Sequence, residues 1–546
     1  MRRARHHQEG HGVDAAGVGG KRQPLSGEIC RGVGGEAADH RDGNGAADPA
    51  EVSRGHSTGG ESGAGKGRTP GERNPGLAGD DRDNRSHPAK AGLAEGEAVS
   101  PAEPPAERSD RPAPDGGKAQ PARVEGLWEA MLSRQNLERA LRQVERNKGA
   151  PGVDGMTVAE LRPWLKTHWP VTLMLLDEGH YRPQPVRRVV IPKPGGGERL
   201  LGVPTALDRL IQQAIAQALT PIFDPGFSKS SFGYRPGRSA HQAVDAAREY
   251  VREGHEWVVD VDLERFFDRV QHDAVMARVA RKVGDRRLLR LIRRYLEAGV
   301  MVEGVKQPSA EGTPQGSPLS PLLSNIMLDD LDRELERRGH RFVRYADDVR
   351  VHVRSERAGE RTLAGLTEFI EKRLKLKVNR KKSTVRRAAQ ATVLGFGFIY
   401  RRDGKVGIRV DPKALERMRL RVRALTGRSW RISMEERIQR LNVFITAWCA
   451  YFKLAETPEE FRDIDGWLRR RLRQVRWEEW KQPATRKRKL RGLGVPPREA
   501  REWGGSGKGP WRAAGTFLSR ALPNSYWDTL GLTTFSERWR QSRFTW

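Results

Sequence analysis

Residues 342–349 of the chain read FVRYADDV, so that two adjacent carboxylates, Asp347 and Asp348, lie between apolar runs. Beyond them valines alternate with polar residues through Val353, which is the period-two pattern of a half-buried strand. The segment is predicted to form a β-hairpin with both carboxylates at its tip. Because neighbouring carboxylates repel each other, a pair of divalent metal ions is the simplest way to hold them together.

A second acidic segment lies upstream. Residues 257–263 read WVVDVDL, a short apolar strand that ends in acids and precedes a predicted helix beginning near Glu264. Side chains two apart on a strand face the same way, so periodicity alone leaves open whether Asp260 or Asp262 is the functional acid. Two Mg²⁺ ions about 4 Å apart, bridged by such carboxylates, can activate a primer 3′-hydroxyl and stabilise the leaving pyrophosphate oxygen. Taken singly, each segment would more often be a solvated turn.

In this order, the two acidic segments resemble motifs A and C of reverse transcriptases. From about Trp128 to the C-terminus the chain is similar to the group II intron-encoded reverse transcriptases, or maturases. The other segments that carry the resemblance are residues 135–155 (N-terminal extension motif), 181–183, 191–194 and 199–204 (first fingers motif), 231–239 (second motif), 312–321 (fourth motif) and 394–398 (seventh motif). So many matches in the family's order favour a shared fold and chemistry.

The resemblance implies an active site. Its catalytic residues would be Asp262, Asp347 and Asp348, and its two Mg²⁺ ions would be bound by these aspartates together with Leu263. The family pattern favours Asp262 over Asp260, which is assigned a structural or supporting role. The implied substrate-binding residues are Lys193, Arg199, Arg235, Phe267, Gln315 and Gly316, and the implied primer grip is Leu394, Gly395, Phe396 and Gly397.

The chemistry of these residue types suits the implied roles. Arginine offers a planar fork to phosphate oxygens and lysine a point charge, as a triphosphate requires. Gly316 lets the backbone approach a ligand closely, and Gln315 can form hydrogen bonds without adding charge. Phe267 lies five positions after Asp262, where the family places an aromatic ring under the incoming sugar, so a ribose 2′-hydroxyl would clash and deoxynucleotides would be favoured. The alternative is that Phe267 is simply a core aromatic beside Phe266.

The composition indicates a polyanionic partner. The chain has 99 Lys and Arg residues against 70 Asp and Glu, a formal charge of +29, which favours nucleic-acid binding through counterion release. Residues 1–122 contain no Phe, Tyr or Trp and are rich in Gly, Ala, Pro and charged residues, so they are predicted to be a disordered low-complexity tail. No apolar run is long enough for a signal peptide or a membrane span, so we expect no membrane contact. The family resemblance implies a bacterial cytoplasmic ribonucleoprotein.

Cysteines are scarce. The chain contains Cys30 and Cys449, too few for a disulfide framework or a zinc site. Family members with a C-terminal endonuclease carry a module with paired cysteines, so we expect an endonuclease-lacking protein that does not itself cleave target DNA.

The residues after about 400 are predicted to be helical and basic. An apolar stripe at helical spacing, with arginines off the stripe, resembles a polymerase thumb and consists of Leu415, Met418, Val422 and Leu425. Two further helices are predicted over 435–452 and 467–480. The arginines predicted to bind RNA backbone on the second of these are Arg469, Arg470, Arg471, Arg473 and Arg476. Aromatic residues that could either stack on unpaired bases or form a small core are Trp511, Trp527, Phe535, Trp539, Phe544 and Trp546.

The expected architecture is α+β. It comprises a right-hand polymerase with fingers and palm over 123–400, a thumb and maturase-specific domain over 401–480, and a basic aromatic nucleic-acid-binding region over 481–546. The protein would be an RNA-directed DNA polymerase that copies a group II intron RNA and also binds that intron to assist its splicing and mobility. Its partners would be intron RNA, an RNA template with a DNA primer, target DNA and dNTPs. Two alternatives stay open: a reverse transcriptase of a diversity-generating or CRISPR-associated system, and an RNA-binding splicing factor whose polymerase has decayed.

Overall fold

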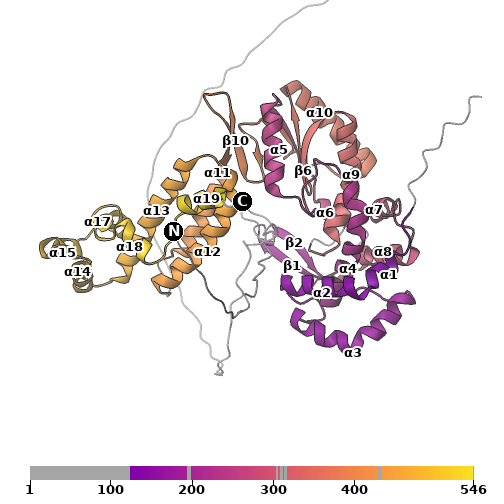
Figure 1. Ribbon diagram of the computed structural model, residues 1–546, viewed down its shortest axis with the longest axis horizontal. Coiled ribbons are helices and arrows are strands. Elements are labelled where there is room, and N and C mark those ends of the chain that lie inside the picture. The colour runs from indigo at the N-terminus through magenta and orange to yellow at the C-terminus, as the bar shows by residue number, and fades with distance from the viewer. Residues whose placement is uncertain are drawn as a thin grey trace, which may run out of the picture. The chain divides into compact units, whose positions relative to one another are not determined.

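The computed structural model describes residues 123–192, 198–302, 305–307, 311–312, 316–427, 430 and 432–544 (Figure 1). The tail over 1–122, expected to be disordered, lies outside the described residues, and so do Lys193, Gln315 and Trp546. Along the part of the chain that is described, no helix has both the length and the apolar composition needed to cross a membrane.

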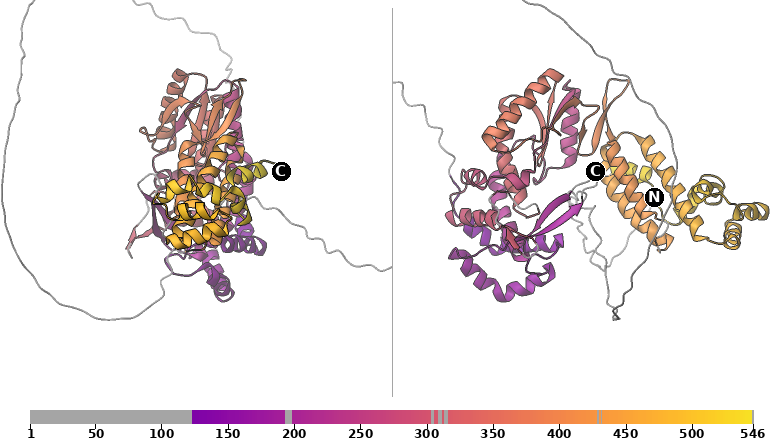
Figure 2. Two further views of the ribbon diagram at one scale, coloured as in Figure 1. Left: turned by 90° about the vertical axis from the view of Figure 1, so that its left-hand side faces the viewer. Right: turned by 180° about the vertical axis from the view of Figure 1, so that it is seen from behind.

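The N-terminal part is built mainly from helices that gather around α4. Its elements are α1 (Leu127–Leu132), α2 (Arg134–Asn147), α3 (Val158–Asp177), β1 (Val186–Pro192), β2 (Glu198–Val203), α4 (Ala206–Phe223) and the 3-10 turn η1 (Asp224–Gly226). Helices α1, α2 and α3 all contact α4. In the right-hand view of Figure 2 the indigo to purple helices of this part lie together at the lower left. On α4, Ala214, Ile215 and Leu219 are 0% exposed, so this helix forms the centre of the first hydrophobic core.

The acidic hairpin belongs to an antiparallel sheet of four strands in the order β6-β7-β3-β8. The elements of this region are α5 (Ala240–Arg252), β3 (Trp257–Val261), α6 (Phe266–Arg269), α7 (His272–Val279), α8 (Arg286–Glu297), β4 (Val300–Val302), β5 (Val305–Gln307), α9 (Ser320–Arg337), β6 (Arg341–Tyr345), β7 (Asp348–Val353), α10 (Glu356–Phe369), the π-helical turn η2 (Ile370–Leu374) and β8 (Thr384–Arg387).

Helices cover both faces of this sheet. On one face Val259 and Val353 pack against Gly359 of α10, whose lack of a side chain lets helix and sheet approach closely. On the other face Val258 and Val343 share a hydrophobic cluster with α5. Figure 1 shows α5 and α10 on opposite sides of the strands. The sheet is therefore held on both sides, and only its strand ends are left for a site.

The described residues form two further sheets. The first has the order β2-β1-β4-β5, with β1 antiparallel to β2 and parallel to β4. The second joins β9 (Thr392–Val393), β10 (Phe396–Tyr400) and β11 (Val406–Val410) in the order β11-β10-β9. This small sheet leads directly into the C-terminal helices.

From α11 onward the regular structure of the described chain is helical. Its elements are α11 (Pro412–Leu425), α12 (Met434–Tyr451), the 3-10 turn η3 (Phe452–Leu454), α13 (Pro458–Glu479), α14 (Pro483–Gly492), α15 (Pro497–Gly504), α16 (Pro510–Ala514), α17 (Leu518–Ala521), α18 (Asn524–Thr529) and α19 (Phe535–Phe544). The apolar stripe predicted on α11 is confirmed as buried, and α12 confirms the second helix. Helix α13 begins earlier than predicted because Pro458 is favourable in a first helical turn. These helices share a second hydrophobic core with α5 and β9–β11.

Candidate active site

The acidic hairpin forms as predicted. Tyr345 at the end of β6 pairs with Asp348 at the start of β7, so Ala346 and Asp347 form a two-residue turn. Ala346 has a φ of +60°, the left-handed conformation that tight hairpin turns require. Asp347 therefore lies at the tip, and Asp348 occupies the first strand position beyond it.

The neighbouring strand brings Asp262 to the same end of the sheet. Strand β3 runs antiparallel to β7 with Val261 opposite Val349, so the next residue, Asp262, lies alongside Asp348. Burial raises the pKa of Asp347 above its ordinary value, and the nearby charges of Asp348 and Asp262 add to this effect. The structure thus brings together the three aspartates that the sequence singled out.

The backbone around Asp262 is fixed by the segment that precedes β8. The Asp262 N–H donates to Ser383 Oγ at 3.0 Å, and the Asn379 N–H donates to the Asp262 carbonyl at 2.8 Å. Leu263, which is 7% exposed, comes next. A leucine can offer a metal ion only its backbone carbonyl oxygen. The neighbouring backbone hydrogen bonds are made by the Asp262 carbonyl and the Glu264 N–H, and not by the Leu263 carbonyl.

Asp260 lies in β3, two residues before Asp262 and therefore further from the tip of the hairpin. The guanidinium of Arg350 lies 3.7 Å from the Asp260 carboxylate and 3.8 Å from that of Asp348. Burial raises the pKa of Asp260, the charge of Arg350 opposes this, and the charge of Asp348 adds to it. Arg350 therefore couples the two carboxylates, an arrangement that suits a supporting role for Asp260.

A buried ion pair, which sequence reasoning missed, anchors the acidic turn. Arg344 Nε and Nη2 donate to the two carboxylate oxygens of Asp332 on α9 at 2.7 and 2.6 Å, and both side chains are 0% exposed. Nη1 of Arg344 donates to Asn325 Oδ1 at 2.8 Å and to the Ala346 carbonyl at 3.0 Å. The guanidinium thereby ties the turn to α9. The available signal was an arginine inside an apolar strand, which needs a buried partner.

Gly233 packs directly against the same turn. A Cβ atom at this position would lie 2.2 Å from the Ala346 nitrogen, so no larger residue fits without moving the turn. The Gly233 carbonyl accepts a hydrogen bond from Asn325 Nδ2 at 2.9 Å, and the Phe232 N–H donates to the Arg344 carbonyl at 2.9 Å. This segment, noted in the sequence as one of the family motifs, is therefore part of the support of the hairpin.

The guanidinium of Arg235 is engaged in hydrogen bonds inside the protein. Its guanidinium donates to the Asp224 carboxylate at 2.7 Å and to the backbone carbonyls of Asp224, Ser228 and Ser231 at 2.6 to 3.0 Å. The side chain is only 6% exposed. The residue therefore holds the loop over 224–231, and its contact with a nucleotide stays a prediction.

Other described members of the expected substrate-binding set are placed differently. Arg199 on β2 is exposed and lies near enough to Asp347 for its charge to oppose the rise in the pKa of that carboxyl that burial causes. Phe267 is half-buried, and its ring meets that of Phe266 edge-on with centroids 5.2 Å apart. Gly316 has a φ of +117°, and a Cβ there would lie 3.0 Å from a backbone carbonyl of β2. The segment at Gly316 thus approaches the strand that carries Arg199.

The expected primer-grip segment forms the turn between β9 and β10. Leu394, with a φ of +52°, and Gly395, with a φ of +84°, are both left-handed, as a two-residue hairpin turn requires. Tyr451 Oη donates to the Leu394 carbonyl at 2.9 Å, and Phe396 is 0% exposed. Gly397 leaves room for an arginine side chain of β11. The turn is thereby fixed to α12 from within the core.

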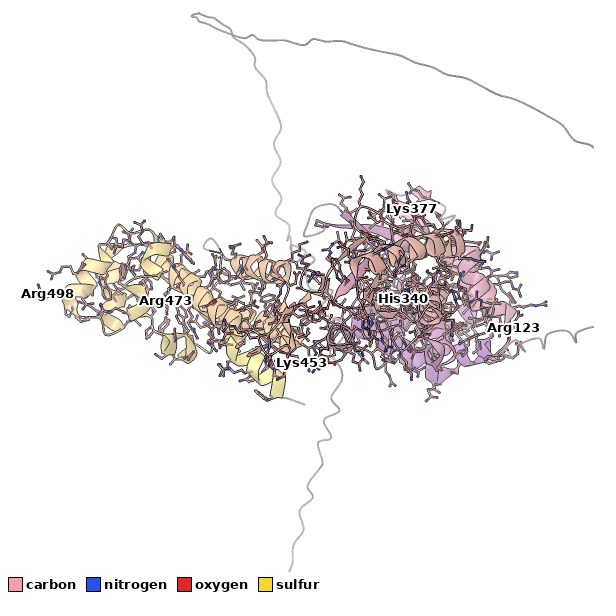
Figure 3. All side chains as sticks on the ribbon, turned by 90° about the horizontal axis from the view of Figure 1, so that it is seen from above. Arg123, His340, Lys377, Lys453, Arg473 and Arg498 are labelled. Carbon is pink, nitrogen blue, oxygen red and sulfur yellow. The ribbon has the colours of Figure 1, made fainter. Side chains whose placement is uncertain are left out.

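Several arginines of α13 are used inside the protein. Arg473 is buried and donates to the carbonyl that follows α17 at 2.9 Å, and Arg471 donates to the threonine hydroxyl that ends α11 at 2.6 Å. These two side chains fasten α13 to its neighbours, and RNA binding by the arginines of this group stays a prediction. Exposed arginines lie on α11, such as Arg417, and Figure 3 shows Arg498 at the outer end of the C-terminal helices with Arg473 among them.

The C-terminal aromatic residues divide between core and surface. Trp527 and Phe535 are 0% exposed and Trp539 is 6% exposed, so these three are core residues. Trp511 at 39% and Phe544 at 82% are exposed. Among the described aromatic residues of this set, Trp511 and Phe544 are therefore the two that are exposed enough to contact a ligand.

The three aspartates suit a divalent cation in their chemistry. In the parts of the chain that the structure describes, no three acidic, histidine or cysteine side chains form a ready-made ion cage. The trio nevertheless supplies only oxygen ligands, which Mg²⁺ prefers. Asp348 and Asp262 add to the effect of burial on the pKa of Asp347, and a bound cation would relieve that repulsion.

Comparisons with known proteins agree on the family. Residues 191–398 match the family model for reverse transcriptase (RNA-dependent DNA polymerase), and residues 415–494 match that for the group II intron, maturase-specific domain. Protein YkfC of Escherichia coli (strain K12) is 37% identical over 222 residues, which are 40% of this chain and 58% of that protein. The group II intron-encoded protein LtrA of Lactococcus lactis is 30% identical over 297 residues, 42% of this chain and 49% of that protein. The chain thus spans about half the length of these relatives.

Solved structures resemble the chain more weakly. A partial Cas6-RT-Cas1-Cas2 complex is 27% identical, with 45% of this chain and 42% of that chain covered and a TM-score of 0.30. Apo telomerase from Candida tropicalis is 14% identical, with 42% and 55% covered and a TM-score of 0.33. At such TM-scores the family assignment rests on the sequence matches alone. The chain thus combines a region similar to the reverse transcriptases, residues 191–398, with a region similar to the group II intron maturase-specific domain, residues 415–494.

Proposed function

We propose that the protein is an RNA-directed DNA polymerase that reverse-transcribes a group II intron RNA. The observation that carries this proposal is the register of β3 and β7, which sets Asp262 beside the turn of Asp347 and Asp348. The matches to the reverse transcriptase family and to the maturase-specific domain support it.

Reverse transcriptase domains generally use divalent metal ions. Here two Mg²⁺ ions would be held by Asp262, Asp347, Asp348 and the backbone oxygen of Leu263. When bound, they would activate the primer 3′-hydroxyl and stabilise the leaving pyrophosphate oxygen. The chain's own contribution is placement, because the buried guanidinium of Arg344 holds the turn that carries two of the carboxylates.

Cationic and aromatic side chains would select the nucleotide. Arg199, exposed near Asp347, would bind the triphosphate of an incoming dNTP. Phe267 would lie under the sugar and exclude a 2′-hydroxyl. Lys193 and Gln315 belong to the proposed set through their sequence motifs, since both lie outside the described residues. The turn at 394–397 would hold the primer end.

The protein would also bind the intron that it copies. We assign fingers and palm to 123–400, a thumb and the maturase-specific domain to 401–480, and a nucleic-acid-binding region to 481–546. Its ligands would be the intron RNA, an RNA template with a DNA primer, and target DNA, within a ribonucleoprotein of the bacterial cytoplasm. A formal charge of +29 and the exposed arginines of α11 support this binding.

Two other functions are less well supported. A splicing factor with a decayed polymerase is disfavoured because all three aspartates are present and the turn is fully supported by Arg344 and Gly233. A reverse transcriptase of a diversity-generating or CRISPR-associated system is disfavoured by the match of residues 415–494 to the maturase-specific domain.

Primer extension on an RNA template tests the polymerase proposal. Asp347→Ala should lower the rate by about 10³-fold or more, which corresponds to about 4 kcal/mol of transition-state stabilisation. The matched control is Asp403→Ala, because Asp403 is an exposed carboxylate whose ion-pair partner is Lys405, at 3.2 Å. Extension that survives Asp347→Ala would refute the catalytic assignment.

Splicing of the intron RNA tests the second role separately. The ribozyme supplies the splicing chemistry, so the protein acts there as a structural cofactor. Asp347→Ala should therefore support splicing at the wild-type rate while losing extension. Loss of both activities in a folded variant would contradict the separation of roles.

A further inference from the structure

A cavity of about 100 Å³ lies between α1, the end of α3 and α8. Helices α1 and α8 contact each other there (Figure 1). The residues that line the cavity include Trp128, Asp177, Glu178, Tyr181, Arg290 and Arg294. It has room for several water molecules or one phosphate group. None of its lining residues belongs to the proposed active site, so its arginines need a separate explanation.

The arginines of α8 fall into two groups. Arg287 and Arg293 form ion pairs with carboxylates of neighbouring elements or of α8 itself. Arg286, Arg290 and Arg294 recur every four residues and so lie along one face of the helix over about 12 Å. Within the described residues, none of these three has a carboxylate partner. This row is therefore a stripe of uncompensated positive charge.

The innermost member of the stripe is partly removed from water. Arg294 is half-buried and donates to the Tyr181 carbonyl at 3.2 Å. Burial lowers the pKa of Arg294, and the charges of Arg182 and Arg290 lower it further. A partly buried cation surrounded by other cations is costly unless an anion joins it.

The two acidic residues of the cavity are already engaged. Asp177 accepts a hydrogen bond from the indole N–H of Trp128 at 2.7 Å. Glu178 pairs with His180 at 3.3 Å, and both of these side chains are exposed. Neither carboxylate is bonded to an arginine of the stripe, so the cavity keeps guanidinium donors for a ligand.

We propose that this cavity binds a backbone phosphate of RNA, with Arg290 and Arg294 as its ligands and with Arg182 and Arg286 beside neighbouring phosphates. Guanidinium forks match the geometry of phosphate oxygens. A small free anion would need a closed cup, whereas an open row of about 12 Å suits a polymer with regularly spaced charges. This site depends on the proposed binding of intron RNA and adds a contact surface remote in sequence from the maturase-specific domain.

The test is the salt dependence of RNA binding by the full chain. Fluorescence anisotropy with a labelled RNA stem-loop would compare wild type with the double variant Arg290→Gln and Arg294→Gln. Each lost phosphate contact should reduce the slope of log affinity against log salt by about 0.7 to 0.9, so the double variant should lose about 1.5. Its affinity should fall roughly tenfold or more. The exposed single variant Arg290→Gln, which breaks no internal ion pair, should lose about half of that slope.

The matched control is Arg293→Gln on the same helix, because that guanidinium is held by Asp273 and Glu297. It should keep the wild-type slope within about 0.3. Equal slopes for the double variant and this control would overturn the proposal. A second result would also overturn the proposal. If inorganic phosphate raised the melting temperature of wild type but not of the double variant, while both proteins showed equal RNA slopes, the cavity would be assigned to a free anion. A wild type that shows the expected slopes but no primer extension would refute the polymerase proposal and leave this site standing.

Discussion

The substitution Asp332→Asn should strongly destabilise the sheet that carries the acidic turn. In the native structure Asp332 receives two hydrogen bonds from Arg344, at 2.7 and 2.6 Å, and both side chains are 0% exposed. The variant leaves a buried guanidinium without its counter-ion, which costs about 3 to 5 kcal/mol. The same guanidinium donates to the Ala346 carbonyl at 3.0 Å, so the turn should also lose its fixed position.

Urea unfolding measures this cost. With a slope of about 3 kcal/mol per M, a loss of 3 to 5 kcal/mol lowers the unfolding midpoint of this domain by about 1 to 1.7 M. The matched control is Glu368→Gln on α10, which contacts the same sheet, because Glu368 pairs with Lys372 at 2.8 Å and both side chains are well exposed. That change should cost about 1 kcal/mol or less. A midpoint shift for Asp332→Asn no larger than that of the control would refute the reasoning.

A double replacement separates stability from placement. Arg344→Met combined with Asp332→Leu removes both charges, so much of the lost stability should return. Primer extension should stay low, because no donor would remain for the Ala346 carbonyl. Recovery of extension together with stability would show that the guanidinium does not position the turn.

Three further outcomes are expected elsewhere in the chain. Gly233→Ala should remove most primer extension, because the added Cβ would lie 2.2 Å from the Ala346 nitrogen. Its control is Gly466→Ala, whose added Cβ would have no atom within 4 Å, and this change should be neutral or slightly stabilising in a thermal melt. Phe267→Ala should raise ribonucleotide incorporation roughly tenfold in single-nucleotide kinetics, and unchanged discrimination would mark the ring as a core residue. Burial lowers the pKa of His352 to about 3, so as the pH falls the imidazole is protonated in the unfolded chain before it is protonated in the folded one. Stability should be full above about pH 7.5 and lower by about 1.4 kcal/mol at pH 5.5, and His352→Leu should remove that loss in urea titrations. An equal loss in both proteins would contradict the assignment.

The hairpin and its acids could be predicted from the sequence because they are local. Alternating valines around Asp348 give the strand, and an Asp-Asp pair between two strands gives the turn. The choice between Asp260 and Asp262 needed the family pattern. The register of β3 with β7 then places Asp262 at the strand end and leaves Asp260 beside Arg350.

The partners of buried charges could not be predicted in the same way. Arg235 bonds to a carboxylate eleven positions away, and Arg344 bonds to one on another element. A sequence shows that a residue is charged, but burial depends on which elements pack together. For the same reason Arg473 of α13 resembled a surface residue in the sequence and is enclosed in the structure.

The most direct test of a metal site shared by Asp262, Asp347 and Asp348 is Mn²⁺ binding measured by electron paramagnetic resonance. The sample would contain the full chain with an RNA template, a dideoxy-terminated DNA primer and the next dNTP, and binding by nucleotide alone would be subtracted. Wild type and Asp403→Asn should bind about two Mn²⁺ ions, and Asp262→Asn should lose binding as completely as Asp347→Asn. Wild-type Mn²⁺ binding by Asp262→Asn would contradict the shared site.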